Sequence, residues 1–188
     1  GNAMEADHYK TLFAGYDVVG LDYHAENPWE AISEFKEFFH GYRKGHDSII
    51  LIANSIGTYF SMCAFNHERV DKAFFISPIV DMEKLILDMM GWADITEEKL
   101  REKQLITTGF GETLSWEYLC YVRNHPVNWS VPTYILYGNK DNLTSQETIH
   151  KFANDVNAEL TIMQNGEHWF HTAEQMAFLD DWIRGLLK

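Results

Sequence analysis

Short apolar runs alternate with amphipathic stretches along most of the chain, a pattern that predicts strands alternating with helices. Residues Ile49 to Ile52 are all aliphatic and predict a short strand buried on both faces. The residues that follow, among them Tyr59, Phe60 and Phe65, are apolar on nearly every side, as expected for a helix packed deep against a sheet. This strand, a sharp turn and this helix form the centre of the predicted fold.

Similar runs predict further strands at residues 16–23, 73–77, 131–137 and 159–163. Helices are expected between them. One covers residues 5–13, and a second starts at Asn27 and Pro28 and ends before Gly45. Two more are opened by capping boxes at residues 144–147 and 172–175. The alternation predicts an α/β fold with a doubly wound, mostly parallel sheet.

Between residues 79 and 128 the alternation stops. Met82 to Met90, Glu97 to Gln104 and Ser115 to Arg123 have helical patterns separated by glycine and proline. We expect one domain, residues 1–188, with residues 79–128 inserted as a small helical cap. The cap is rich in methionine and aromatic residues, which either line an apolar pocket or fasten the cap to the body: Met82, Met89, Met90, Trp92, Phe110, Trp116, Tyr118 and Tyr121.

Composition narrows the classes of function. The chain has 15 Lys and Arg against 28 Asp and Glu, a net charge of -13, which argues against nucleic-acid and anionic-membrane partners. Cys63 and Cys120 match neither a disulfide framework nor a metal-binding spacing, so a reducing compartment, the cytoplasm, is expected. No apolar run approaches the length of a membrane span.

The central turn reads Ala53-Asn54-Ser55-Ile56-Gly57, a serine flanked at two residues on either side by small residues. Together with its strand and helix, it resembles the nucleophile elbow of the α/β-hydrolases, with alanine in place of the first glycine. The resemblance implies that Ser55 is a nucleophile and that the N–H of Ile56 donates to an oxyanion. Alternatively, Ser55 is only the N-cap of the helix.

The order of the other polar candidates also resembles that family, in which serine, acid and histidine follow one another along the chain. Asp141 follows the strand that ends in Gly138, and His168 follows the last strand as Gly166-x-His168. Asp141 could instead only initiate a turn, and His171 competes with His168 for the role of the base. Asp22 is expected to be structural, and the other histidines lack metal-ligand spacings.

The resemblance implies a serine hydrolase that cleaves a small-molecule carboxylic ester, thioester or amide through a Ser55–His168–Asp141 triad, without a metal or organic cofactor. A non-catalytic ligand-binding protein on the same fold is the alternative. A nucleotide-binding domain would need a glycine-rich phosphate loop, and the first expected strand is not followed by one. The sequence does not specify an oligomeric state.

The start of the chain is unusual for this fold, because the helix expected at residues 5–13 has no preceding strand to pack on. Gly1 and Asn2 resemble the end of the glycine-rich loop that supplies the second oxyanion donor in α/β-hydrolases. We therefore expect that strands and most of this loop precede Gly1. Alternatively, the first residues, Gly1-Asn2-Ala3-Met4, are a tag remnant before an initiating methionine.

Overall fold

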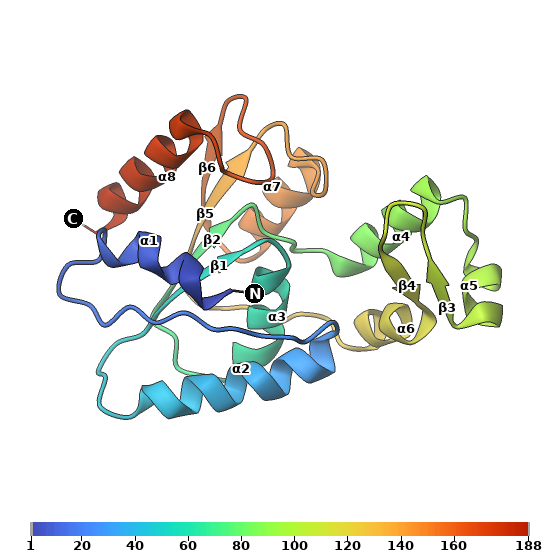
Figure 1. Ribbon diagram of the computed structural model, residues 1–188, viewed down its shortest axis with the longest axis horizontal. Coiled ribbons are helices and arrows are strands. Elements are labelled where there is room, and N and C mark those ends of the chain that lie inside the picture. Colours follow the sequence, from blue (N-terminus) through green and yellow to red (C-terminus); the bar gives the residue numbers. More distant parts are fainter. Residues whose placement is uncertain (1, 188) are drawn as a thin grey trace.

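In the part of the chain that the structure describes, four parallel strands form the central sheet, in the order β1-β2-β5-β6 (Figure 1). The computed structural model describes residues 2–187. Its sheet is built from β1 (Ile50–Asn54), β2 (Lys72–Ile76), β5 (Thr133–Gly138) and β6 (Glu159–Met163). Every neighbouring pair is parallel. The expected α/β architecture with a parallel sheet is therefore confirmed.

Alternate residues of the buried strands supply two apolar cores, one on each face of the sheet. In β2, Ala73 and Phe75 face one core, and Phe74 and Ile76 face the other. The first core includes residues of α2 (Pro28–Arg43), α3 (Ser55–Phe65) and α7 (Gln146–Asp155). The second includes residues of α8 (Ala173–Leu186), with α1 (Ala6–Lys10) against it. Helices thus cover both faces, as a doubly wound sheet requires.

Capping side chains fix where the helices begin. The side chain of Asn27 accepts a hydrogen bond from the N–H of Glu30, and Pro28 occupies the first turn of α2. The capping box expected at Thr172 and Gln175 opens α8. The one expected at residues 144–147 does not form. Ser145 alone caps α7, and Thr144 is buried with its hydroxyl donating to the carbonyl of Pro78.

The strand expected at residues 16–23 is absent, and this prediction was wrong. Residues 17–25 form no helix or strand and belong to no ladder among the described residues. Leu21 and Tyr23 pack against one core and Val18 against the other. Among residues 2–187, β1 pairs with β2 and with no other strand, so the apolar residues of this segment are buried by side-chain packing and not by a place in the sheet.

The first helix is also shorter than expected. Residues Ala3–Glu5 form a 3₁₀ turn (η1), and α1 ends at Lys10 rather than at Phe13. Asn2 caps the turn by accepting a hydrogen bond from the N–H of Met4. Gly1, which we related to a glycine-rich loop, lies outside the described residues.

The chain leaves the sheet after β2 and returns at β5, and the elements between lie to one side of it (Figure 1). They are α4 (Met82–Trp92), α5 (Glu97–Lys103), β3 (Leu105–Thr107), β4 (Thr113–Ser115) and α6 (Trp116–Asn124). The three helices match the expected positions. The antiparallel hairpin of β3 and β4 was missed, because each strand has only three residues and shows no measurable alternation.

The methionine and aromatic residues of this inserted segment have two different environments. Met82 and Met90 are buried in the core, so packing accounts for them. Trp92 and Phe110 are instead about half exposed and contact each other edge to face, with ring centroids 6.2 Å apart. These two aromatic residues therefore lie at the surface rather than in a closed pocket.

Two buried tyrosines of the core differ in the hydrogen bonding of their hydroxyls, and the effect of this difference on stability can be tested. Tyr59 of α3 is buried, its hydroxyl has no oxygen or nitrogen partner among the described residues and only the weakly bonding thiol of Cys63 beside it, and burial raises the pKa of its phenol far above the usual range. Tyr137 is equally buried, but its hydroxyl donates to the carbonyl of Thr144 at 2.8 Å. An unsatisfied buried hydroxyl is destabilising, whereas a satisfied one contributes about 1 kcal/mol.

We therefore expect Tyr59→Phe to leave the free energy of unfolding unchanged or to raise it by about 1 kcal/mol, and Tyr137→Phe to lower it by about 1 kcal/mol. Urea unfolding followed by circular dichroism measures both. A clear loss of stability in Tyr59→Phe would contradict the assignment of its hydroxyl as unsatisfied.

Candidate active site

Ser55 stands at the point where β1 passes directly into α3. Its φ is +46°, in the left-handed region that is unfavourable for residues other than glycine. Asn54 occupies the N-cap position and makes no side-chain cap bond. The interpretation of Ser55 as a simple N-cap is thus wrong: Ser55 is the first residue of the helix, and its Oγ lies 2.8 Å from Nε2 of His168.

Asp141 uses its two carboxylate oxygens for different purposes. Oδ1 accepts hydrogen bonds from the N–H groups of Leu143 and Thr144, at 2.8 and 3.0 Å, and closes the turn after β5. Oδ2 lies 2.7 Å from Nδ1 of His168. The turn role and the contact with histidine, which the sequence presented as alternatives, are therefore both present.

The three groups form one continuous chain from Ser55 Oγ through the imidazole of His168 to Asp141. The Asp141 side chain is 0% exposed and that of His168 is 15% exposed, so the carboxylate is closed off from solvent and the imidazole is partly open to it. A buried carboxylate is tolerated only when its oxygens are paired. The arrangement can therefore accept the hydroxyl proton of Ser55 at Nε2 while the carboxylate holds the other ring nitrogen.

A close backbone contact brings Asp141 and His168 together. Gly138, at the end of β5, lies so near Gly166 that a Cβ on Gly138 would stand 2.4 Å from the carbonyl carbon and oxygen of Gly166. The N–H of Lys140 donates to the carbonyl of Gly166 at 2.8 Å, and the N–H of Asn165 donates to the Asn139 side chain at 2.7 Å. The turns that carry the acid and the histidine are thus bonded to each other.

Ile56 follows Ser55 in the first turn of α3. Amides at this end of a helix have no acceptor within it, and the helix dipole makes them favourable partners for negative charge. The position of Ile56 is compatible with the expected oxyanion donor, and that role stays a prediction.

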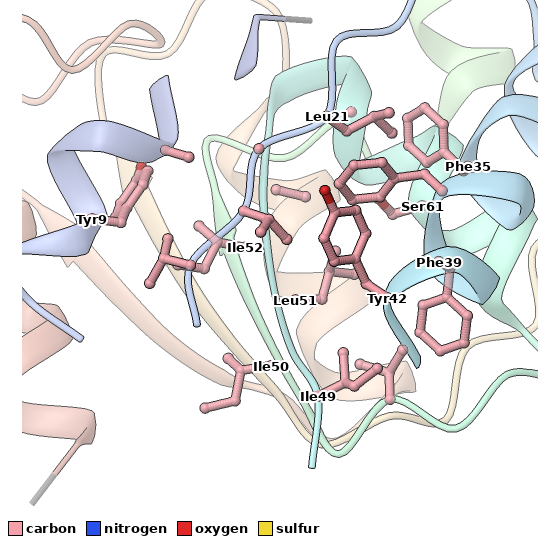
Figure 2. A pocket seen from close by; sticks show the side chains of 18 of the residues that line it. Tyr9, Leu21, Phe35, Phe39, Tyr42, Ile49, Ile50, Leu51, Ile52 and Ser61 are labelled. Carbon is pink, nitrogen blue, oxygen red and sulfur yellow. The ribbon is translucent and has the colours of Figure 1, made fainter. Parts of the chain in front are cut away.

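A cavity of about 690 Å³ extends from the elbow along the side of β1 that faces away from β2. Figure 2 shows the apolar side chains that line it, with Tyr9 on α1, Phe39 and Tyr42 on α2, and Ile50 and Ile52 on β1. Ser55, Ile56 and Gly57 belong to the same lining, as does the segment that includes Leu21 and Tyr23. The cavity therefore separates β1 from the segment that was expected to form a strand.

The remaining candidate residues have other roles. His171 lies outside the chain of Ser55, His168 and Asp141: its ring stacks on Trp169 with centroids 4.8 Å apart, and its Nδ1 lies 2.7 Å from the Trp169 carbonyl oxygen. Asp22 accepts a hydrogen bond from the N–H of Ala3, which agrees with its expected structural role. Within residues 2–187, no group of three or more His, Cys, Asp or Glu side chains could hold a metal ion.

Two residues near Ser55 escaped the sequence analysis. Ser77 follows β2, one residue beyond the paired residues Asn54 and Ile76; it is buried with φ +44°, and its Oγ makes no hydrogen bond to a described residue. The hydroxyl of Tyr23 lies 3.6 Å from the place where a Cβ on Gly57 would stand. The sequence signal that could have pointed to Ser77 is a polar residue between a buried apolar run and Pro78. Tyr23 was not recognised as a neighbour of the elbow because it was assigned to the expected strand at residues 16–23.

The fold agrees with that of known proteins, although the sequence matches no protein-family model and no curated protein. Among solved structures, Est1E of Butyrivibrio proteoclasticus with bound ferulic acid is 13% identical, with a TM-score of 0.68 over 97% of this chain and 79% of its own. Mouse alpha/beta hydrolase domain-containing protein 10 is 14% identical, with a TM-score of 0.66 over 96% and 80% of the two chains.

A lipase-esterase related protein from Clostridium acetobutylicum is 16% identical, with a TM-score of 0.63 over 98% of this chain and 89% of its own. At these identities the likeness concerns the fold. The chain has the fold of the α/β-hydrolases. No helix among the described residues is long and apolar enough to span a membrane.

The contact between Gly138 and Gly166 can be tested by substitution. In Gly138→Ala the new methyl group would overlap backbone atoms of Gly166 and Glu167, which cannot move without shifting the histidine turn. We expect a loss of about 1–3 kcal/mol in the free energy of unfolding, the usual range for overpacking. Urea unfolding measures it.

Gly109→Ala is the matched control, because a Cβ there would meet no atom within 4 Å and its φ is not in the left-handed region. Its stability should match that of the unmodified protein within about 0.5 kcal/mol. Equal stabilities for the two variants would disprove the close contact.

Proposed function

We propose that this chain is a serine hydrolase that cleaves a small carboxylic ester, thioester or amide through an acyl-enzyme. The observation that carries the proposal is the chain of short contacts from Ser55 through His168 to Asp141, at 2.8 and 2.7 Å, with the serine on a left-handed turn before a helix. Such a serine, with a base within reach and a third group orienting the base, is the arrangement that activates a hydroxyl nucleophile.

In the proposed reaction, Ser55 Oγ attacks the carbonyl carbon while His168 Nε2 accepts its proton. Asp141 keeps the other imidazole nitrogen protonated and stabilises the imidazolium, and the N–H of Ile56 stabilises the oxyanion. The leaving group departs with the proton from His168. Water then attacks the acyl-serine by the same steps, which releases the acid and restores Ser55.

The fold supports hydrolase chemistry in general, because proteins of similar structure are esterases and hydrolases. Substrate choice is a further proposal. We assign residues 79–128 the role of a cap beside the site, and the net charge of -13 favours neutral or cationic substrates over anionic ones. Since Est1E binds ferulic acid, an aromatic ester such as methyl ferulate belongs in the first substrate screen beside p-nitrophenyl acetate.

Covalent labelling tests the nucleophile. We expect a fluorophosphonate probe to modify Ser55, as located by mass spectrometry of the labelled peptide, because the reagent reacts with serines activated by a base. Ser55→Ala should abolish labelling, and His168→Ala should reduce it strongly. Ser77→Ala, which removes the neighbouring serine, is the control for site assignment. If an intact, folded sample is not labelled, a ligand-binding protein without catalysis becomes the better description.

The orienting role of Asp141 predicts a large kinetic effect. Asp141→Asn should lower kcat for p-nitrophenyl acetate by about 10⁴-fold, because the amide no longer holds the imidazole in the tautomer that accepts the serine proton. Asp155→Asn, which changes an exposed carboxylate paired with Lys151 on α7, should leave kcat unchanged. Equal rates in the two variants would exclude Asp141 as the acid of the triad.

A further inference from the structure

We propose that Thr144 is a positioning residue of the candidate active site: its side-chain hydroxyl bonds the turn that carries Asp141 to a segment that is also bonded to Ser55. The inference rests on the proposed hydrolase function. Neither the motif at Ser55 nor the order of serine, acid and histidine points to Thr144, which the sequence presented only as part of a capping box. Thr144 acts through Asp141 and does not meet the substrate.

Three polar groups of Thr144 are paired. Its N–H donates to Oδ1 of Asp141 at 3.0 Å, and its hydroxyl donates to the carbonyl of Pro78 at 3.1 Å. Its own carbonyl accepts a hydrogen bond from the Tyr137 hydroxyl at 2.8 Å. Thr144 is only 6% exposed, so water competes little for these bonds. The turn that holds the carboxylate is therefore bonded through Thr144 to a second part of the chain.

That second part is bonded to the serine turn as well. Pro78 and Ile79 follow β2, and the N–H of Ile79 donates to the carbonyl of Ser55 at 3.1 Å. Both residues are buried, and the proline ring restricts the backbone between the two hydrogen bonds. Ser55 and Asp141 follow strands that are not neighbours, because β2 lies between β1 and β5. The segment after β2 thus connects the two turns, and the hydroxyl of Thr144 supplies the bond on the acid side.

This connection bears on catalysis because the imidazole of His168 must contact both turns at once. Its Nδ1 lies 2.7 Å from Oδ2 of Asp141, and its Nε2 lies 2.8 Å from Ser55 Oγ. The rigid ring keeps both contacts only while the separation of the two turns stays fixed. A change in that separation lengthens at least one contact, and a misplacement of about 1 Å can slow a reaction about 100-fold.

Thr144→Val tests the proposal because it replaces the hydroxyl by a methyl group and keeps the N–H that bonds Asp141. The buried carbonyl of Pro78 then loses its donor, which is unfavourable. We expect kcat for p-nitrophenyl acetate to fall by about 10- to 100-fold, with KM changed by less than about twofold. Thr144→Ser, which retains the hydroxyl, should keep kcat within about threefold of that of the unmodified protein. An unchanged kcat in Thr144→Val would overturn the proposal.

Thr133→Val is the matched control. Thr133 begins β5, at the opposite end of that strand from Asp141. It is similarly buried, and its hydroxyl also donates to a carbonyl, that of Val131 at 2.7 Å. The control should lower the thermal stability as Thr144→Val does but leave kcat unchanged. An equal fall of kcat in both variants would show a general effect of destabilisation and would disprove the positioning role.

A second pair of variants isolates the same hydroxyl if Thr144→Val does not fold. Thr144→Ser and Thr144→Ala differ by one oxygen atom, and both leave more room around Pro78 than valine does. We expect kcat to be at least about tenfold lower in Thr144→Ala than in Thr144→Ser. Equal kcat values in this pair would contradict the role of the hydroxyl.

A double substitution shows whether Thr144 acts through Asp141. Asp141→Asn alone should lower kcat by about 10⁴-fold. If the hydroxyl only positions the carboxylate, Thr144→Val added to Asp141→Asn should lower kcat by less than about twofold more, so that the two effects are not additive. A further loss of about tenfold or more would mean that Thr144 acts independently of Asp141, contrary to the proposal.

Labelling of the unmodified protein separates the two possible failures. If the fluorophosphonate probe modifies Ser55 and Thr144→Val retains its kcat, the role of Thr144 is disproved and the proposed function stands. If the unmodified protein is neither labelled nor active, the proposed function falls, and the role of Thr144 falls with it.

Discussion

The pairing of one buried carboxylate holds the candidate site together. Asp141 has no exposed side-chain surface, and a negative charge in that position is stable only if donors surround it. Two donors are amides of its own turn, and the third is the imidazole of His168, 27 residues away. The same requirement therefore shapes the turn after β5, fixes the histidine ring, and through that ring sets the environment of Ser55.

The parallel sheet makes this pairing possible. Ser55, Asp141 and His168 follow β1, β5 and β6, whose carboxyl ends lie at one edge of the sheet because all strands run in the same direction. Residues 113 positions apart in the chain are brought to 2.8 Å in this way. Glycine at 138 and 166 allows the two turns to approach more closely than any side chain would permit.

The candidate site could be anticipated from the sequence because its signals are local. Each of the three residues follows a buried apolar run, and their order along the chain resembles that of a known family. The strand at residues 16–23 could not be judged in this way. Its apolar residues do pack against the two cores, but a strand also needs a bonded neighbour, which no local pattern reveals. For the same reason the positions of Tyr23 and Ser77 near the elbow became visible only in three dimensions, since their neighbours there are distant in sequence.

The contact between Gly138 and Gly166 limits how the sequence around the site can vary. The two residues meet through backbone atoms: a Cβ on Gly138 would stand 2.4 Å from the carbonyl of Gly166, and one on Gly166 would stand 2.9 Å from the Cα of Gly138. A tight contact between two side chains can be relieved by shortening one of them, but neither glycine has a side chain to shorten. A larger residue at one position therefore cannot be compensated by a change at the other.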